Sequence, residues 1–292
     1  MRQFLVLTLN GLSAGMVYAA LALALVLIWR ATRIVNFAQG AMAMFTTYIA
    51  LGVMQATGSY WLGFGAAIGA GLVLGAVVER VLVRRVAQGP PLNAVILTLG
   101  LLLFLQAIVP MIYGGQIRSF PPAVSYVGLR IGDTVIPYSP FDLFTLGSVL
   151  VTMLLLYALF KFTSVGLQMR AAAFAPEVAR LLGVRVGRML TLGWALASAA
   201  GALAGVLVAP VVLLSPNSLD PVLVFGFVAA ILGGLDSPVG ALAGGLGLGL
   251  ALSYVGGYVG VDLETAGALL ILIVVLMVRP EGIFANIRHR RV

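Results

Sequence analysis

The sequence predicts an all-α integral membrane protein, a polytopic helical bundle of about eight to nine spans with discontinuous or re-entrant helices and two related halves. Of its 292 residues, 62% are hydrophobic and 9% are charged, whereas soluble domains carry about 25% charged residues. The mean hydropathy of +1.13 agrees with a membrane protein. The 36 glycines suit helices whose backbones approach closely. We expect a single transmembrane domain over residues 1–292, in contact with the lipid bilayer.

Nine apolar stretches account for the predicted spans. Stretches near 20 residues are long enough to cross the hydrocarbon core. The stretch at 221–235 is shorter and is a candidate re-entrant or half helix, which a bilayer tolerates where protein packs around it. In chain order the stretches lie at about 4–28, 37–56, 61–83, 93–113, 142–160, 189–213, 221–235, 238–256 and 264–278.

Pairs of small residues four positions apart recur in these stretches. Such pairs let two membrane helices come into close contact, although each pair alone is a weak signal in a glycine-rich chain. Together they favour a compact bundle over loosely associated spans. The pairs are Gly11/Gly15, Gly71/Gly75, Gly201/Gly205, Gly240/Gly244 and Gly245/Gly249.

Three arginine-rich segments, 80–85, 161–188 and 279–291, predict the orientation. Basic residues favour the cytoplasmic side of a membrane, so an even number of crossings must separate these segments. This places the C-terminus in the cytoplasm and the N-terminus outside, unless a re-entrant stretch near 37–56 reverses the N-terminal side. Because the net charge of +8 is distributed over span ends, it does not indicate nucleic-acid binding.

The longest outside loop, about 114–140, contains a hairpin signal. Val127, Leu129 and Ile131 alternate with smaller or polar residues, and Gly132-Asp133 is a typical hairpin turn. The hairpin is either a lid on the bundle or a docking site for an outside partner.

The cytoplasmic loop, about 162–188, contains a short helix with its own start and stop. Proline suits a first helical position, glutamate suits a helix start, and glycine suits a C-terminal stop. The apolar residues among them follow helical spacing and form one small face. The helix either binds a soluble partner or rests on lipid headgroups. The residues concerned are Arg170, Pro176, Glu177, Val178, Arg180, Leu181, Leu182 and Gly183.

The sequence lacks the residues that metal sites and ATP hydrolysis usually require. The chain has no cysteine and one histidine, His289, so metal sites built from these residues are unavailable. Its one lysine, Lys161, follows no glycine-rich loop, so the chain lacks the phosphate-binding loop of an ATPase. We expect no catalytic residue, no metal and no cofactor in this chain. An intramembrane enzyme is therefore the least favoured class.

The positions of the acids speak against an ion-coupled carrier, because such carriers keep acids at membrane depth. Asp236, in the segment GGLDSPVG, is the one ambiguous acid. Either it forms a turn or helix start, which the Asp-Ser-Pro signal favours, or it faces a central cavity. The other acids fall at or near span ends or in loops, at Glu79, Asp133, Asp142, Glu177, Asp220, Asp262, Glu264 and Glu281.

Two interruptions of apolar stretches are candidates for the translocation path, because broken helices expose backbone groups that can line one. Each comes early in a glycine- and alanine-rich run, which suggests two related halves. The alternative is that both are interfacial loops with helix caps. Thr98 is a weaker candidate, since a hydroxyl in a membrane helix often bonds its own backbone. The candidates are Asn36, Gln39 and Gly40 at the first interruption and Gly233, Gly234 and Asp236 at the second.

Four segments in order now suggest a family. Residues 33–40, RIVNFAQG, closely resemble the "nFAqGe" segment of branched-chain amino acid ABC-transporter permeases, of the shorter of their two types. Residues 166–184, with a Gly-x-x-x-Arg-Ala opening and an Ala-x-Leu-Leu-Gly-Val close, are similar to the cytoplasmic coupling loop of that family. Residues 228–244, VAAILGGLDSPVGALAG, and 279–284, RPEGIF, resemble its "LGG…G…GA…G" and "RP.GlfG" segments.

The resemblance implies a subunit of a bacterial inner-membrane importer, with a second related permease as its pair. Two cytoplasmic ATPases, which bind ATP and Mg, would drive transport through the coupling loops, and a periplasmic binding protein would deliver the substrate. A branched-chain amino acid is the expected substrate. Alternatives are a urea or short-chain amide importer of the same kind, or a stand-alone carrier or channel.

Overall fold

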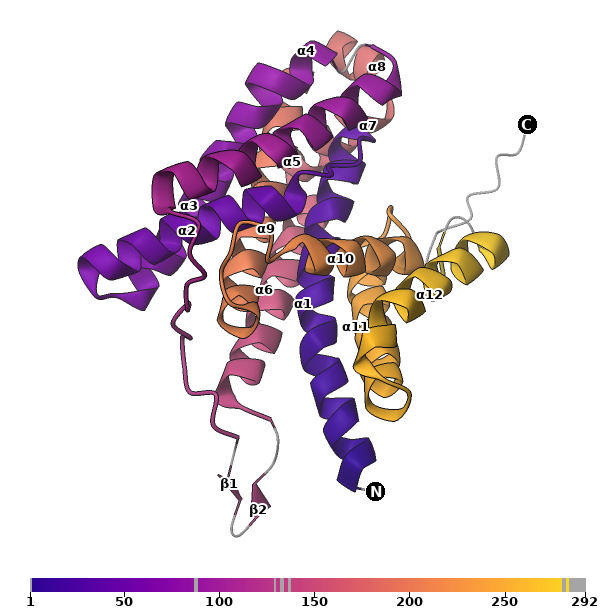
Figure 1. Ribbon diagram of the computed structural model, residues 1–292. Coiled ribbons are helices and arrows are strands. Elements are labelled where there is room, and N and C mark those ends of the chain that lie inside the picture. The colour runs from indigo at the N-terminus through magenta and orange to yellow at the C-terminus, as the bar shows by residue number, and fades with distance from the viewer. Residues whose placement is uncertain are drawn as a thin grey trace.

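The longest helix, α1 (Arg2–Thr32), runs through the bundle, and α9 (Val186–Val212) packs beside it (Figure 1). In the most apolar stretch of each of these two helices, 72% of the residues are buried. The computed structural model describes residues 2–86, 89–128, 130–131, 134–135, 138–279 and 282–283. The predicted turn at Gly132-Asp133, Glu281 and the tail that contains His289 lie outside the described residues.

The remaining elements follow the predicted apolar stretches. Seven helices in the described part of the chain are long and apolar enough to cross a membrane. The 19-residue α2 and the 14-residue α10 complete the nine apolar segments, and the predicted all-α membrane bundle is confirmed. The elements are α2 (Gln39–Thr57), α3 (Tyr60–Val77), the π-helical η1 (Val78–Val83), α4 (Arg84–Val86), α5 (Pro91–Tyr113), β1 (Arg130–Ile131), β2 (Thr134–Val135), α6 (Pro140–Phe162), α7 (Ser164–Phe174), α8 (Pro176–Leu181), α10 (Asp220–Gly233), α11 (Pro238–Tyr258), the 3₁₀ turn η2 (Val261–Leu263) and α12 (Glu264–Val278).

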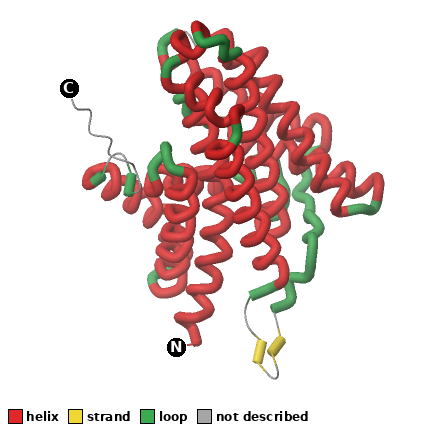
Figure 2. The backbone as a smooth tube through the Cα atoms, turned by 180° about the vertical axis from the view of Figure 1, so that it is seen from behind, coloured by secondary structure: helices red, strands yellow, loops and turns green. Residues whose placement is uncertain are grey.

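The bundle has two distinct ends. At one end lie α4, α7 and α8 (Figure 1), and we call this the arginine-rich end because it carries the arginines of segments 80–85 and 170–188. The N-terminus and the strands β1 and β2 lie at the opposite end, as Figure 2 also shows from behind. There the side-chain amide of Gln3 donates to the carbonyl of Gly257 (3.4 Å), which joins the start of α1 to the end of α11.

The predicted small-residue pairs lie at helix–helix contacts. A β-carbon added to Gly11 or Gly15 of α1 would lie 2.9 Å from a Cα atom of α11, so these two backbones are already in contact. Such close approach is the usual basis of helix association in membranes. The other pairs make similar contacts: Gly71/Gly75 of α3 with α9, Gly201/Gly205 of α9 with α2, Gly240/Gly244 of α11 with α10, and Gly245/Gly249 of α11 with α1.

The loop between α5 and α6 contains the predicted hairpin. β1 and β2 pair antiparallel, with Arg130 opposite Val135 and Ile131 opposite Thr134. The loop is anchored where the backbones of Arg118 and Leu214 exchange hydrogen bonds of 2.9 and 2.8 Å. Burial, followed by the nearby carboxylate of Asp142, raises the pKa of Tyr126 to about 12. The loop is thus packed onto the bundle at these points.

Candidate functional site

The cytoplasmic loop predicted at 162–188 contains two helices where the sequence indicated one. The missed helix, α7, begins after Thr163, whose hydroxyl accepts from the amide of Gly166 (3.1 Å). A β-carbon on Gly166 would collide with the backbone of Phe160, so α7 turns tightly off the end of α6. Met169 and Ala172 are 3% exposed and pack α7 against the bundle. A capping threonine was the available signal for this helix.

The short helix α8 begins and ends where predicted. Pro176 lies in its first turn, and Gly183 follows it at φ +81°. The amide of Gly183 donates to the carbonyl of Arg180 (3.0 Å), and that of Val184 donates to Ala179 (2.9 Å). These two bonds form a Schellman motif, in which a left-handed residue, usually glycine, closes a helix.

Three apolar residues within and directly after α8 point away from the helical bundle. The exposed fractions are 55% for Val178, 89% for Leu181 and 78% for Leu182, and we call these three residues the α8 face. Ala179 is 2% exposed and packs on the bundle side. Phe174, at the end of α7, is 87% exposed. Grouped apolar side chains at an exposed site typically mark a protein or membrane interaction surface. The predicted polar residues beside them are exposed as well: Arg170, Glu177 and Arg180.

The first helix interruption is a buried cluster of amides. Asn36 and Gln39 are both 0% exposed, and the Asn36 side-chain amide donates to the Gln39 side-chain oxygen (3.0 Å). The Asn36 oxygen accepts from the backbone amide of Ala38 (3.0 Å), and the Gln39 amide donates to the carbonyl of Ala197 in α9 (3.1 Å). These bonds join the start of α2 to α9. A buried polar group is tolerated when it is paired in this way.

The neighbouring path candidates are also buried. Gly40 lies against Leu223 of α10, where an added β-carbon would come 3.1 Å from the leucine side chain. Thr98 is 1% exposed, and its hydroxyl donates to the carbonyl of Val95 in its own helix (3.0 Å). Thr98 thus has the backbone partner that is usual for a hydroxyl in a membrane helix.

The second interruption is a tight turn between α10 and α11. Gly233 packs on the backbone of Gly240 with no space for a β-carbon, and Gly234 adopts φ +92°. Ser237, not Asp236, caps α11, by accepting from the amide of Gly240 (2.9 Å). Asp236 is exposed and pairs with Arg33 (2.6 Å).

The Arg33–Asp236 contact brings the two interruptions together at the arginine-rich end, although they lie 203 residues apart in sequence. Arg33 itself adopts φ +59° just after α1, a conformation that costs a residue with a β-carbon about 1–2 kcal/mol. This juxtaposition agrees with the idea that both segments act at one place. Their role in a translocation path stays a prediction.

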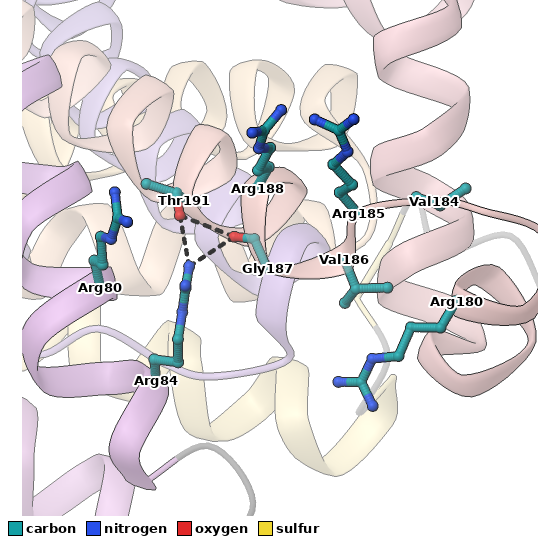
Figure 3. A pocket seen from close by; sticks show the side chains of 9 residues that line it. All are labelled: Arg80, Arg84, Arg180, Val184, Arg185, Val186, Gly187, Arg188 and Thr191. Atoms are coloured by element: carbon teal, nitrogen blue, oxygen red, sulfur yellow. Dashed lines mark hydrogen bonds between the residues drawn. The ribbon is translucent and has the colours of Figure 1, made fainter.

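One buried acid that links two helices was not recognised from the sequence. Glu79, in the π-helical η1, is 1% exposed and accepts two hydrogen bonds from Arg84, at 3.1 and 2.8 Å, and one from the Thr191 hydroxyl at 2.6 Å. Arg84 also donates to the carbonyl of Gly187 and to Thr191, both at 2.8 Å (Figure 3). In the sequence, Glu79 stands only as an acid directly before the arginine-rich segment 80–85, which does not indicate burial. The partners in α9 lie more than 100 residues away.

The apolar contact among α1, α6 and α9, bounded by Ala20, Val149 and Leu203, has no room for a water molecule. Among the described residues, no three acidic or histidine side chains lie close enough together to hold a metal ion.

Comparisons with known proteins agree with this architecture. The family model "Branched-chain amino acid transport system / permease component" matches residues 7–278. The chain is 30% identical to the high-affinity branched-chain amino acid transport system permease protein LivH of Escherichia coli K12, covering 97% of this chain and 96% of that protein. It is 29% identical to BraD, the permease protein of the same description from Pseudomonas aeruginosa, with 95% and 94% covered.

A solved structure supports the fold alone. PsaBC from Streptococcus pneumoniae, in complex with Fab, aligns with a TM-score of 0.52 at 14% identity, covering 93% of this chain and 91% of that one. The predicted family resemblance is confirmed by the family model and the relatives. The chain therefore belongs to the family of branched-chain amino acid transport system permease components, which are multi-pass membrane proteins.

Proposed function

We propose that this chain is the transmembrane permease subunit of an ATP-driven importer for branched-chain amino acids, and that α8 couples it to a cytoplasmic ATPase. The observation that carries the coupling proposal is the α8 face, Val178, Leu181 and Leu182, which is exposed next to α7, a helix whose Met169 and Ala172 are buried. LivH and BraD are permease proteins of branched-chain amino acid transport systems, and their similarity to this chain supports the substrate class.

The proposed assembly has the arginine-rich end in the cytoplasm, as expected from the positive-inside bias. Two ATPase subunits bind ATP and Mg there, a second related permease completes the membrane part, and a periplasmic binding protein delivers substrate at the opposite end. A groove on the ATPase receives α8, a common way in which an amphipathic helix joins two proteins. Exposed Arg170, Glu177 and Arg180 orient the helix in that groove, and closure of the ATPase pair moves α7 and α8 together.

The test replaces the α8 face without disturbing the bundle. In the double variant Leu181→Asp/Leu182→Asp, uptake of labelled leucine by the reconstituted complex should fall to background, because two carboxylates cannot be buried in an apolar groove. The spans should still insert, since both residues are exposed. The matched control, Leu181→Met/Leu182→Met, keeps the apolar area and should retain uptake.

Three results would each overturn a part of the proposal. Normal uptake and normal copurification of the ATPases with the Asp variant would show that α8 is not the coupling element. Uphill uptake by this chain alone in liposomes, driven by an ion gradient, would show a stand-alone carrier. Uptake of labelled urea but not of labelled leucine by the reconstituted complex would move the substrate to the amide class.

A further inference from the structure

A cavity of about 430 Å³ lies at the arginine-rich end, between η1 and the start of α9 (Figure 3). It combines residues of four elements, because α4 and α8 also contribute to its walls. The lining residues are Arg80, Arg84, Arg180, Val184, Arg185, Val186, Gly187, Arg188 and Thr191. The walls therefore contain five guanidinium groups.

The cavity has an excess of positive charge. Among the described residues, the one acid that pairs with a lining residue is Glu79, which accepts hydrogen bonds from Arg84 and Thr191. Within the described chain, the other four arginines, Arg80, Arg180, Arg185 and Arg188, have no ion pair and no side-chain hydrogen bond. Like charges so close together repel, so an anion in the cavity would stabilise the arrangement.

The donors suit a phosphate group. Arg84 is fixed by its bonds to Gly187 and Thr191, whereas Arg80, Arg185 and Arg188 extend toward the same side of the view in Figure 3. A guanidinium presents several N–H groups in one plane and matches the oxygens of a phosphate better than an ammonium does. Arginine–phosphate bonds are also among the stronger hydrogen bonds.

Exposed apolar residues also lie on the helices that carry the arginines of the cavity. Val73, Val77 and Val81 recur every fourth residue along α3 and η1 and are 64%, 49% and 43% exposed. On α9, Leu192 is 41% exposed and lies one turn after Arg188. A positively charged cavity at the ends of apolar membrane helices has the position of a lipid-headgroup site.

We propose that this cavity binds the phosphate of an acidic phospholipid. Basic pockets between membrane helices on the cytoplasmic side are known to bind such headgroups. The inference goes beyond the proposed transport function and needs only the arginine-rich end to face the headgroups.

The test measures lipid binding to the purified full chain in neutral detergent, by titration with phosphatidylglycerol, phosphatidylcholine or inorganic phosphate. The variant Arg80→Gln/Arg188→Gln removes two cavity charges and leaves the Glu79–Arg84 pair in place. Each arginine near a membrane surface contributes about a 5-fold effect, so affinity for phosphatidylglycerol should fall about 25-fold. The control Arg85→Gln/Arg279→Gln removes the same charge outside the cavity lining and should change affinity less than about 2-fold.

The single variants Arg80→Gln and Arg188→Gln keep the test informative if the double variant unfolds, since each should weaken binding about 5-fold. Equal binding of phosphatidylcholine, or equal loss in the control, would overturn the proposal. So would full competition by inorganic phosphate at equal concentration, which would assign the cavity to free phosphate. Displacement of phosphatidylglycerol by added ATPase subunits would assign it to a protein interface.

Discussion

Two ion pairs join distant segments at the arginine-rich end, and they differ in burial. Glu79 is 1% exposed and pairs with Arg84 at 2.8 Å, with Thr191 of α9 as a further partner. Asp236 and Arg33 are 57% and 49% exposed and pair at 2.6 Å, across the two helix interruptions. The exposed pair is therefore the shorter one.

Burial, rather than distance, decides what each pair contributes to stability. Water screens both members of an exposed pair, which contributes about 0–1 kcal/mol. A buried carboxylate has lost its hydration and depends on its partner, so removal of that partner costs about 3–5 kcal/mol. We therefore expect the Glu79 junction between α3 and α9 to be structural and the Arg33–Asp236 contact to break and re-form at little cost.

The largest effect should come from Arg84→Gln. Glu79 would remain buried without its cation, and the free energy of unfolding should fall by about 3 kcal/mol, the low end of the range because Arg84 is 41% exposed. Chemical unfolding in mild detergent measures this difference. The neighbouring Arg85→Gln removes the same charge from an exposed position and should change stability by less than about 0.5 kcal/mol. Equal losses in the two variants would show that burial of Glu79 is not the cause.

An intermediate effect should come from Gln39→Leu, which breaks the neutral junction between α2 and α9. The side-chain amide of Asn36, 0% exposed, would lose its oxygen acceptor and keep only the weak sulfur acceptor of Met42, at a cost of about 1–3 kcal/mol. Thermal unfolding in detergent reports the change. In the control Thr98→Val, the lost hydroxyl bonded only its own helix, so the expected loss is about 0.5 kcal/mol. If Thr98→Val is the more damaging change, the amide cluster does not hold α2 to α9.

The smallest effect should be the coupling between Arg33 and Asp236. A double-mutant cycle with Arg33→Gln and Asp236→Asn should give a coupling free energy below about 1 kcal/mol at low salt. In 1 M salt the screening length is about 3 Å, and the coupling should approach zero. A coupling of several kcal/mol that persists in 1 M salt would contradict the comparison. It would mean that the two interruptions are held together as firmly as α3 and α9.

Local sequence chemistry predicted the helices and their ends well. Pro176 and Gly183 bound α8 because proline fixes φ and glycine tolerates positive φ whatever the surroundings. The helix α7 was missed, since its buried residues Met169 and Ala172 give only a weak apolar pattern in a polar loop. The predicted small-residue pairs do lie at contacts, but the sequence did not indicate which helix each pair meets.

The sequence predicted the candidate sites less well than it predicted the helices. The sequence singled out Asp236 as the one ambiguous acid, but its side chain is exposed. Glu79 was grouped with the acids at span ends, but its side chain is buried. Hydropathy cannot separate these cases, because the burial of an acid at a helix end depends on which neighbouring helix covers it. Asn36 and Gln39 were correctly singled out as unusual polar residues, and their partner Ala197 lies 158 residues from Gln39.

Hydrophobicity, basic segments and the local signals of proline, glycine and capping residues determined the membrane bundle, its helices and the short helix α8. These are properties of neighbouring residues, so they can be read along the chain. The tertiary structure alone decided that Glu79 is buried, that both interruptions meet through Arg33 and Asp236, and that five arginines surround one cavity. Each of these depends on which helices pack together, and packing joins residues that the sequence separates by a hundred positions or more.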